Sequence, residues 1–304
     1  MTIKDIPSSN DFRKMGIEHI MIGYDGVLKF LTPLHENDDD YDETMPEKMD
    51  HIQEYWEDAR LSLLVHTGLI HEGVDFILKG LISNVSPYLL IKNDPSEIKK
   101  KEYFSDLLTH DSKALPLLVN TYCESRLEDK FLRMFENSRK RRNKIRHTYD
   151  GSLKVQAEDI VKETLQMVNY LLNDKWMDLR CDYYNREAFL TLYQAYDLTA
   201  RPHLLNEFKV LSKILIPSEF RAAFHTHKKQ RFFLCFSCTH PDYTDEIRTC
   251  HLVEEDGFKY LFCLLCSENF ETHEKKCREE DCECNVVVSK YSKCAYCSEY
   301  DFHR

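Results

Sequence analysis

The feature that most constrains the fold of this chain is the crowding of cysteines near its C-terminal end. Ten of the 12 cysteines lie between Cys235 and Cys297. The segment 231–304 is otherwise poor in apolar side chains, so burial of hydrophobic surface alone would not hold it together. A metal bound by several thiolates would, because metal binding then drives folding. We therefore predict a small cysteine-rich zinc-binding module over residues 231–304.

The spacing of these cysteines predicts one or two Zn²⁺ ions per chain. Two Cys-x2-Cys pairs, Cys235/Cys238 and Cys263/Cys266, lie 24 residues apart, a separation at which four thiolates can close a tetrahedral site. We predict a second set of ligands at Cys282, Cys284, Cys294 and Cys297, with Cys250, His251, His273 and Cys277 as alternatives. A cross-braced arrangement, in which alternating pairs share a metal, is also compatible with the spacing. Four protein ligands leave no position for water, so the zinc is expected to be structural.

The N-terminal part of the chain carries no recognisable targeting signal. Its first residues lack the apolar stretch of a signal peptide, and no apolar run approaches the length of a membrane span. We expect a cytoplasmic protein with no membrane partner. In that compartment thiols stay reduced, which favours metal binding over disulfides as the use of the cysteines.

Most of the remaining chain has the three-and-four spacing of amphipathic helices. Its 304 residues, 42% of them hydrophobic, suffice for one large or two ordinary domains with a sizeable core. The pattern predicts an N-terminal segment and acidic linker over 1–48, a helical bundle over 49–178 and a helical extension over 179–230. Within the first segment, residues 17–31 have helical spacing, although Gly16, Gly23 and Gly26 would also suit a hairpin. The predicted fold class is mainly α, with a helical bundle followed by the zinc-binding module.

Charge is distributed very unevenly along the chain. The net charge is −11, which by itself argues against a nucleic-acid partner. Residues 36–58, however, contain eleven acids and one lysine, so this segment carries most of the negative charge. Residues 139–146 contain six basic side chains and no acid, and such a local patch favours phosphate binding. The expected RNA-binding residues are Arg139, Lys140, Arg141, Lys144 and Arg146.

The same basic segment contains a small set of polar residues at the end of a predicted helix over about 125–147. At the helical period of about 100° per residue, Arg142 falls on the stripe of Phe131, Phe135 and Ser138, where a hydrophobic residue is expected. A guanidinium on an apolar stripe needs a partner, because burial of an unpaired charge is unfavourable. Asn143 and His147 are four residues apart and therefore neighbours on an adjacent face.

The sequence Arg142-Asn143-Lys144-Ile145-Arg146-His147-Thr148-Tyr149 resembles the Arg-x4-His-x-Tyr signature of HEPN domains (higher eukaryotes and prokaryotes nucleotide-binding). The resemblance implies a helical bundle with the motif late in the bundle. It also implies metal-independent RNA cleavage by attack of the 2′-OH on the adjacent phosphate, with Arg142, Asn143 and His147 as catalytic residues. Because one motif is present, the resemblance implies a homodimer. In toxins of this family a partner nucleotidyltransferase modifies the tyrosine, here Tyr149, although those toxins are shorter and lack a zinc module.

Three classes of function follow from these patterns. The first is a HEPN-type endoribonuclease that acts as a toxin or as a defence or stress effector, with RNA as its substrate and a possible antitoxin or nucleotidyltransferase as its partner. The alternative is a non-catalytic HEPN-like adaptor that binds nucleotides, RNA or protein. A DNA-binding regulator is the weakest of the three, because acids and bases are mixed in the cysteine-rich segment instead of forming a basic face.

Overall fold

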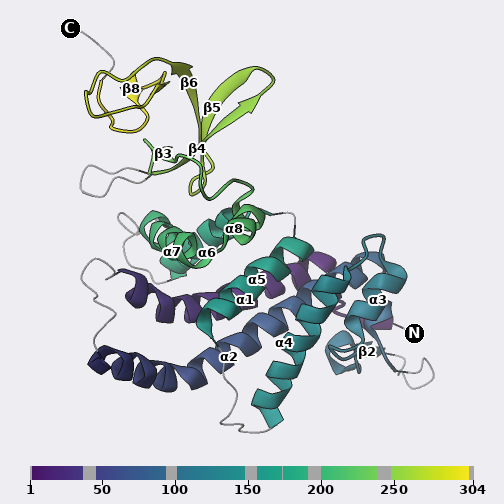
Figure 1. The fold of residues 1–304 in the computed structure, drawn as a ribbon. Helices are drawn as coiled ribbons and strands as arrows, with labels where there is room; N and C mark the ends of the chain where they lie inside the picture. Colours follow the sequence, from purple (N-terminus) through teal and green to yellow (C-terminus); the bar gives the residue numbers. More distant parts are fainter. Residues whose placement is uncertain are drawn as a thin grey trace. The chain divides into compact units, whose positions relative to one another are not determined.

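The computed structural model describes residues 2–36, 46–93, 101–147, 156–172, 174–190, 200–238 and 248–300. The chain divides into two compact units, Met1–Asn173 and Asp174–Arg304 (Figure 1). The first unit is helical, and the second combines helices with a cysteine-rich antiparallel sheet. The boundary between the units lies close to residue 178, where the sequence pattern ends the bundle.

Five α-helices make up most of the first unit. They are α1 (Ser9–Glu36), α2 (Pro46–Val85), α3 (Leu115–Tyr122), α4 (Asp129–His147) and α5 (Ala157–Leu171), accompanied by the short helices η1 (Pro87–Leu90) and η3 (Phe104–Asp106). The strands β1 (Thr2–Lys4) and β2 (Lys101–Tyr103) form a parallel pair. The inward face of α5 shows the expected periodicity, since Ile160, Val161, Thr164, Leu165 and Val168 are all buried.

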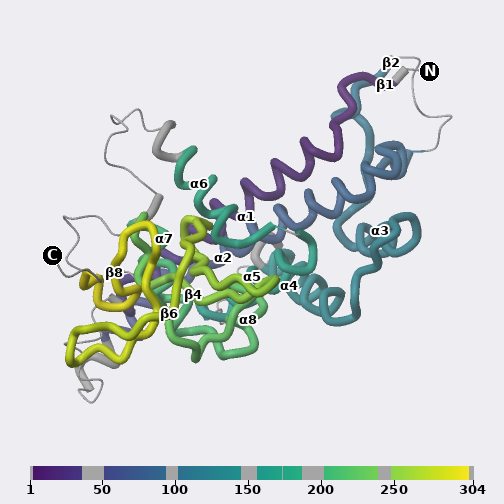
Figure 2. Tube along the Cα trace, turned by 90° about the horizontal axis from the view of Figure 1, so that it is seen from above, coloured from purple at the N-terminus to yellow at the C-terminus, as the bar shows by residue number. Residues whose placement is uncertain are grey.

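Residues 9–36 form one long helix that packs along α2, so the segment expected to precede the bundle is part of it (Figure 2). Gly16, Gly23 and Gly26, which would also have suited a hairpin, lie where α1 comes close to α2. A Cβ atom built on Gly16 would lie 2.7 Å from the backbone oxygen of Gly73, and one built on Gly73 would lie 2.6 Å from that of Gly16. These glycines therefore serve helix packing and not a turn.

We expect Gly73→Ala to destabilise the protein by about 1–3 kcal/mol, because the added methyl group would overlap backbone that cannot move without separating the helices. Gly68→Ala in the same helix is the matched control. Among the described residues no atom lies within 4 Å of a Cβ built there, and alanine is the better helix former by about 1 kcal/mol. Urea unfolding should give changes of opposite sign for the two variants. Equal stabilities would contradict the close approach of α1 and α2.

One segment of α2, His51–Val85, is long and apolar enough to cross a membrane by length and composition. The sequence pattern predicted no such segment, because polar residues interrupt its apolar run. Half of the most apolar 18-residue stretch of this segment is buried inside the protein. This helix contacts α1, α3, α4 and α5, which is the arrangement of a central core helix.

The helices of the second unit are α6 (Trp176–Leu190), α7 (Ala200–Ile214) and α8 (Pro217–Phe224). A fully buried ion pair joins α6 to α7, with Nε of Arg180 2.7 Å from Oε2 of Glu207. The indole Nε1 of Trp176 donates to the other carboxylate oxygen at 2.7 Å. Each charge in this apolar interior thus has a partner, which removes most of the penalty of its burial.

The cysteine-rich part of the second unit is a six-stranded antiparallel sheet whose strands follow chain order, β3-β4-β5-β6-β7-β8. Its strands are β3 (Phe233–Leu234), β4 (Arg248–Glu255), β5 (Phe258–Cys263), β6 (Asn269–Glu274), β7 (Val286–Val288) and β8 (Lys293–Cys294). Consecutive strands are antiparallel neighbours, so alternate connections meet at one end of the sheet, as do those that contain Cys238 and Cys266.

Candidate functional site at Arg142 and candidate metal centres

Helix α4 places Arg142 on its inward face, as the helical spacing predicts. Phe131, Phe135 and Ser138 on the same stripe are at most 2% exposed. The Arg142 side chain is 13% exposed, so its guanidinium lies at the edge of this core.

The guanidinium of Arg142 is held by two partners. Its Nη1 atom donates to Oδ2 of Asp75 on α2 at 3.2 Å, and the Asp75 side chain is also 13% exposed. Its Nε and Nη2 atoms both donate to Oδ1 of Asn143, at 3.3 and 3.2 Å. Asn143 therefore orients the arginine by accepting two hydrogen bonds, and Asp75 compensates its charge.

Asp75 connects Arg142 to a chain of buried polar groups. Ser112 donates its hydroxyl to Oδ1 of Asp75 at 2.7 Å. The two ring nitrogens of His71 lie 3.0 Å from Oγ of Ser112 and 3.1 Å from Oγ of Ser138. His71 is fully buried, and its ring lies 5.0 Å from that of Phe135. The network joins α2, α4 and the segment before α3, and such networks hold side chains in one arrangement.

Burial raises the pKa of Asp75 to about 6, against the opposing effects of the Ser112 hydrogen bond and the positive charge of Arg142. A carboxyl group of this kind changes its charge close to neutral pH. Arg142 therefore faces a carboxylate that is mostly ionised well above pH 6 and a mostly neutral acid well below it.

This raised pKa predicts a stability that falls as the pH increases. The folded state holds a proton on Asp75 more tightly than the unfolded state does, so its contribution is complete below about pH 4 and is lost as the pH rises through 6. The change amounts to roughly 3 kcal/mol. We expect Asp75→Asn, which cannot ionise, to gain stability relative to the wild type over this range. Urea unfolding of both proteins between pH 4 and pH 7 measures the difference.

Asp58→Asn is the control for this pH profile, because Asp58 is an exposed carboxylate on the same helix. Its difference from the wild type should stay nearly constant between pH 4 and pH 7. A similarly constant difference for Asp75→Asn would show that Asp75 is ionised in the folded protein well below pH 6.

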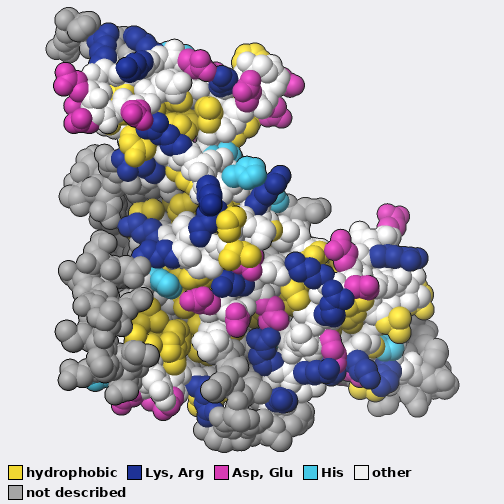
Figure 3. All heavy atoms as spheres, viewed as in Figure 1, with side chains coloured by type: hydrophobic (Ala, Val, Ile, Leu, Met, Phe, Trp, Pro, Cys, Tyr) yellow, Lys and Arg dark blue, Asp and Glu magenta, His cyan; other side chains and the backbone are white. Residues whose placement is uncertain are grey.

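Most of the predicted RNA-binding cations already have acidic partners. Arg139 binds Glu136 through two hydrogen bonds of 2.8 and 2.9 Å, which lower the pKa of Glu136 to about 2. Lys140 lies 3.5 Å from the same carboxylate, and Arg141 lies 2.7 Å from Glu163 on α5. Basic and acidic side chains are correspondingly interleaved over the face of the first unit seen in Figure 3. The basic run of the sequence is therefore largely neutralised by neighbouring carboxylates.

Several predicted residues fall outside the part of the chain whose side chains are described. The backbone of Arg146 and His147 belongs to the last turn of α4, but their side chains lie outside the described residues, and so does Tyr149. Lys144 is exposed.

The sequence pattern did not identify Asp75 as a partner of Arg142, nor His71 as a member of the same network. His71 and Asp75 are four residues apart on α2, a spacing that places two titratable groups on one face. That spacing was the available signal, yet it is common on surface helices. Only the packing of α4 against α2 shows that this face is turned toward Arg142.

The first predicted zinc site is brought together by the fold. The sulfur atoms of Cys235, Cys238, Cys263 and Cys266 all lie within 4.8 Å of one another. Two of the Sγ–Sγ distances are 3.6 and 3.9 Å. Tetrahedral coordination with Zn–S bonds of about 2.3 Å requires sulfur separations of roughly 3.8 Å. The four thiols therefore fit a zinc ion.

Local backbone geometry prepares this first site. The amide of Cys238 donates to the sulfur of Cys235 at 3.3 Å, and the amide of Leu265 donates to that of Cys263 at 3.4 Å. Hydrogen bonds among the four cysteines lower the pKa of Cys235 to about 5 and also lower that of Cys263, whereas they raise the pKa of Cys238 and Cys266. Two of the four sulfur atoms thus favour the thiolate, the form of cysteine that binds metal.

The second cluster differs from the prediction in one ligand. Cys277, Cys282, Cys294 and Cys297 lie within 4.8 Å of one another, with Sγ–Sγ distances of 3.5 Å for Cys277–Cys297 and 3.8 Å for Cys282–Cys294. Cys277, named as an alternative, takes the place predicted for Cys284. The buried sulfur of Cys284 lies 3.6 Å from the backbone oxygen of Val286 and receives a hydrogen bond from that residue's amide. This local contact turns Cys284 away from the cluster.

The two clusters follow one another along the chain, so the sites are not cross-braced. Each of the pairs Cys263/Cys266 and Cys294/Cys297 is followed directly by a serine with positive φ, 56° at Ser267 and 63° at Ser298. The repeated conformation indicates the same tight turn at both sites. Two structural metal sites, each with four thiol ligands, are consistent with zinc.

Comparisons of the chain with protein-family models, with curated proteins and with solved structures found no match. What bears on the function of the chain is therefore the chemistry of the cysteine clusters and of the residues around Arg142.

Proposed function

We propose that this protein is a metal-independent endoribonuclease of the HEPN type, acting as a toxin or as a defence or stress effector in the cytoplasm. The observation that carries the proposal is the position of Arg142 on the core-facing stripe of α4, where Asp75 and Asn143 fix its guanidinium. Because the guanidinium is already fixed, it loses little further conformational entropy when it binds a phosphate group.

The proposed reaction begins with attack of the ribose 2′ oxygen on the adjacent phosphorus. A base accepts the 2′-OH proton, the bond from phosphorus to the 5′ oxygen breaks, and an acid returns a proton to that oxygen. The products are a 2′,3′-cyclic phosphate and a free 5′-OH. His147 has the intrinsic pKa for one of these proton transfers near neutral pH. Arg142 would stabilise the negative charge that develops on the phosphate oxygens.

A homodimer belongs to this proposal, because one chain supplies one motif histidine while the reaction uses both an acid and a base. A two-fold axis beside the motif would place two copies of His147 across a common groove. Tyr149 is the residue on which a partner nucleotidyltransferase would act if an antitoxin of that type exists. The zinc module would then recognise RNA or a partner, or brace the dimer.

The experiment is cleavage of mixed RNA by the purified full chain in the presence of EDTA. We expect single-stranded RNA to be cut, with 2′,3′-cyclic phosphate ends, and His147→Ala to lose most of the activity while the protein stays folded. Wild-type chains co-expressed with His147→Ala chains should show well below half the activity per wild-type chain. Equal activity of wild type and His147→Ala would refute the catalytic assignment, and activity proportional to the number of wild-type chains would refute the composite site.

A non-catalytic RNA-binding or protein-binding adaptor is the second candidate. The pairing of Arg139, Lys140 and Arg141 with Glu136 and Glu163 leaves less free positive charge for phosphate, which favours the protein-binding form of such an adaptor. The same experiment separates the two functions. Folded, zinc-loaded protein that retains RNA or a partner without cleaving RNA would favour the adaptor.

A further inference from the structure

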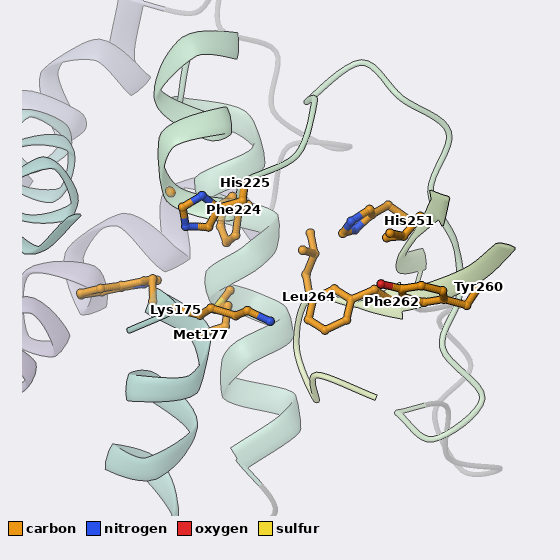
Figure 4. A pocket seen from close by; sticks show the side chains of 11 residues that line it. Lys175, Met177, Phe224, His225, His251, Tyr260, Phe262 and Leu264 are labelled. Atoms are coloured by element: carbon orange, nitrogen blue, oxygen red, sulfur yellow. The ribbon is translucent and has the colours of Figure 1, made fainter. Parts of the chain in front are cut away.

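The second unit contains a cavity of about 210 Å³ whose described lining residues include no cysteine, although Phe262 and Leu264 flank Cys263 of the first cluster. The end of α8 and the beginning of α6 form one side of the cavity, and the strands β4 and β5 form the other. Figure 4 shows the side chains of the two sides facing one another across it. The cavity therefore lies where the helices of this unit meet its sheet.

The walls of the cavity are mostly apolar and aromatic. Trp176 and Phe224 contribute from the helices, and Phe262 contributes from β5. The volume is smaller than the roughly 300–1,000 Å³ of sites that enclose a whole drug-sized ligand. At about 30 Å³ per water molecule, it equals the space of roughly seven waters. The cavity thus suits a single flat ring system, with the remainder of the ligand outside.

His251 lines the cavity, and its ring nitrogen Nδ1 is buried and lacks a hydrogen-bond partner within the described parts of the chain. His251 pairs across the sheet with Phe262, and their rings meet edge to face with centroids 5.6 Å apart. A buried polar atom without a partner carries a desolvation penalty, which a hydrogen-bonding ligand would remove. The ring that fits here therefore needs a nitrogen or oxygen at its edge.

Lys175 gives the mouth of the cavity a positive charge. Lys175 and His225 line the cavity and are exposed, and Nζ of Lys175 lies 4.1 Å from the ring centroid of Phe262. No aspartate or glutamate is among the described residues that line the cavity. An anionic group attached to the inserted ring would meet the ammonium group of Lys175 and the imidazole of His225 at the mouth.

We propose that this cavity binds a nucleobase, stacked among its aromatic walls and hydrogen-bonded to His251, with the attached phosphate at Lys175 and His225. A base is flat, has hydrogen-bonding atoms on its edge, and is joined through a sugar to an anion. Two sources supply this chemistry, a free nucleotide and one unstacked nucleotide of single-stranded RNA. Stacking of a base on aromatic side chains is the general way in which proteins hold unpaired nucleotides.

The test is titration of the full, zinc-loaded chain with adenosine 5′-monophosphate and, separately, with a 2′-O-methyl adenylate hexamer. The hexamer lacks the 2′-OH nucleophile, so its binding does not depend on the proposed cleavage reaction. The chain has two tryptophans, and a Trp56→Phe background leaves Trp176 as the single reporter. Fluorescence change and calorimetry should both show binding. Tighter binding of the hexamer would identify RNA as the source, and equal or tighter binding of the monophosphate would identify a free nucleotide.

Ala223→Leu and Ala222→Leu form the matched pair of variants. Ala223 lines the cavity, whereas its neighbour Ala222 on α8 is exposed and does not. The leucine at 223 should fill the space and weaken binding roughly 5- to 150-fold, the range expected from loss of one stacked base. The leucine at 222 should leave affinity unchanged. Lys175→Gln should also weaken binding, and Lys229→Gln outside the cavity should not.

Three results would overturn the proposal. The first is that neither probe binds. The second is that the wild type and a folded Ala223→Leu variant bind the probes with equal affinity. The third is that inorganic phosphate binds as tightly as adenosine 5′-monophosphate. Zinc content and thermal unfolding establish whether Ala223→Leu is folded. If it is not, His251→Leu decides the question, because it keeps an apolar wall and removes Nδ1. Unchanged affinity in His251→Leu would then contradict the assigned hydrogen bond.

Discussion

Replacement of Cys263 and Cys266 together by serine is expected to remove one of two zinc ions per chain and to unfold the sheet of the second unit. The two residues supply half the ligands of the first cluster. Structural zinc contributes on the order of 10–16 kcal/mol to the folding of zinc-finger peptides. That contribution is as large as the whole stability of an ordinary domain, about 5–15 kcal/mol. Metal analysis, together with thermal unfolding of the purified chain, measures both effects.

Single substitutions in the second cluster provide the matched controls. Cys277→Ser should lose one zinc, because its sulfur belongs to the cluster. Cys284→Ser should keep both ions, because the Cys284 sulfur contacts the backbone of Val286 instead. Loss of a zinc ion in Cys284→Ser but not in Cys277→Ser would instead support the ligand set predicted from spacing, which contains Cys284 in place of Cys277. A metal-free wild-type protein of ordinary stability would contradict the metal centres altogether.

Replacement of Arg142 by alanine is expected to reduce RNA cleavage by roughly 100- to 1,000-fold, the usual effect of removing one group that stabilises transition-state charge. Arg142→Lys keeps the positive charge opposite Asp75 but loses the planar pair of donors that matches a phosphate. We therefore expect most of the activity to be lost in this variant as well, with the fold retained. Initial cleavage rates of a labelled single-stranded RNA in EDTA measure both variants.

Arg141→Ala is the control for Arg142, because Arg141 precedes it on the same helix and is bound to Glu163. Removal of that side chain should change the cleavage rate only slightly. Similar losses in Arg141→Ala and Arg142→Ala would indicate a general effect of charge on RNA binding and not a specific role of Arg142. Full activity in a folded Arg142→Ala protein would exclude the proposed site.

The sequence was most informative where the relevant pattern is local. Helical spacing placed Arg142 on the inward stripe of α4, and burial of Phe131, Phe135 and Ser138 agrees with that placement. The Cys-x2-Cys pairs likewise predicted the first cluster, because a tight turn brings two sulfur atoms together whatever surrounds it. Periodicities and turns of this kind depend on residues within a few positions of one another.

The tertiary structure was needed wherever the partner is distant in the sequence. Asp75 and His71 lie 67 residues from Arg142 and Ser138, the residues that they contact. Their proximity depends on how α2 and α4 pack. In the same way, Glu163 reaches Arg141 only because α5 lies beside α4. A sequence run that looked like a basic patch is therefore largely paired with acids in the folded protein.

The same distinction separates the two metal sites. The first could be derived from spacing, since two tight pairs supply all four ligands. In the second, Cys277 and Cys282 are five residues apart, and Cys284 lies close to both in the sequence. Spacing alone therefore does not show which two of these three cysteines bind the metal. The course of the chain between β6 and β8 brings Cys277 to the cluster and directs Cys284 toward the backbone of Val286. Ligand choice there is a matter of chain path, which short-range spacing does not encode.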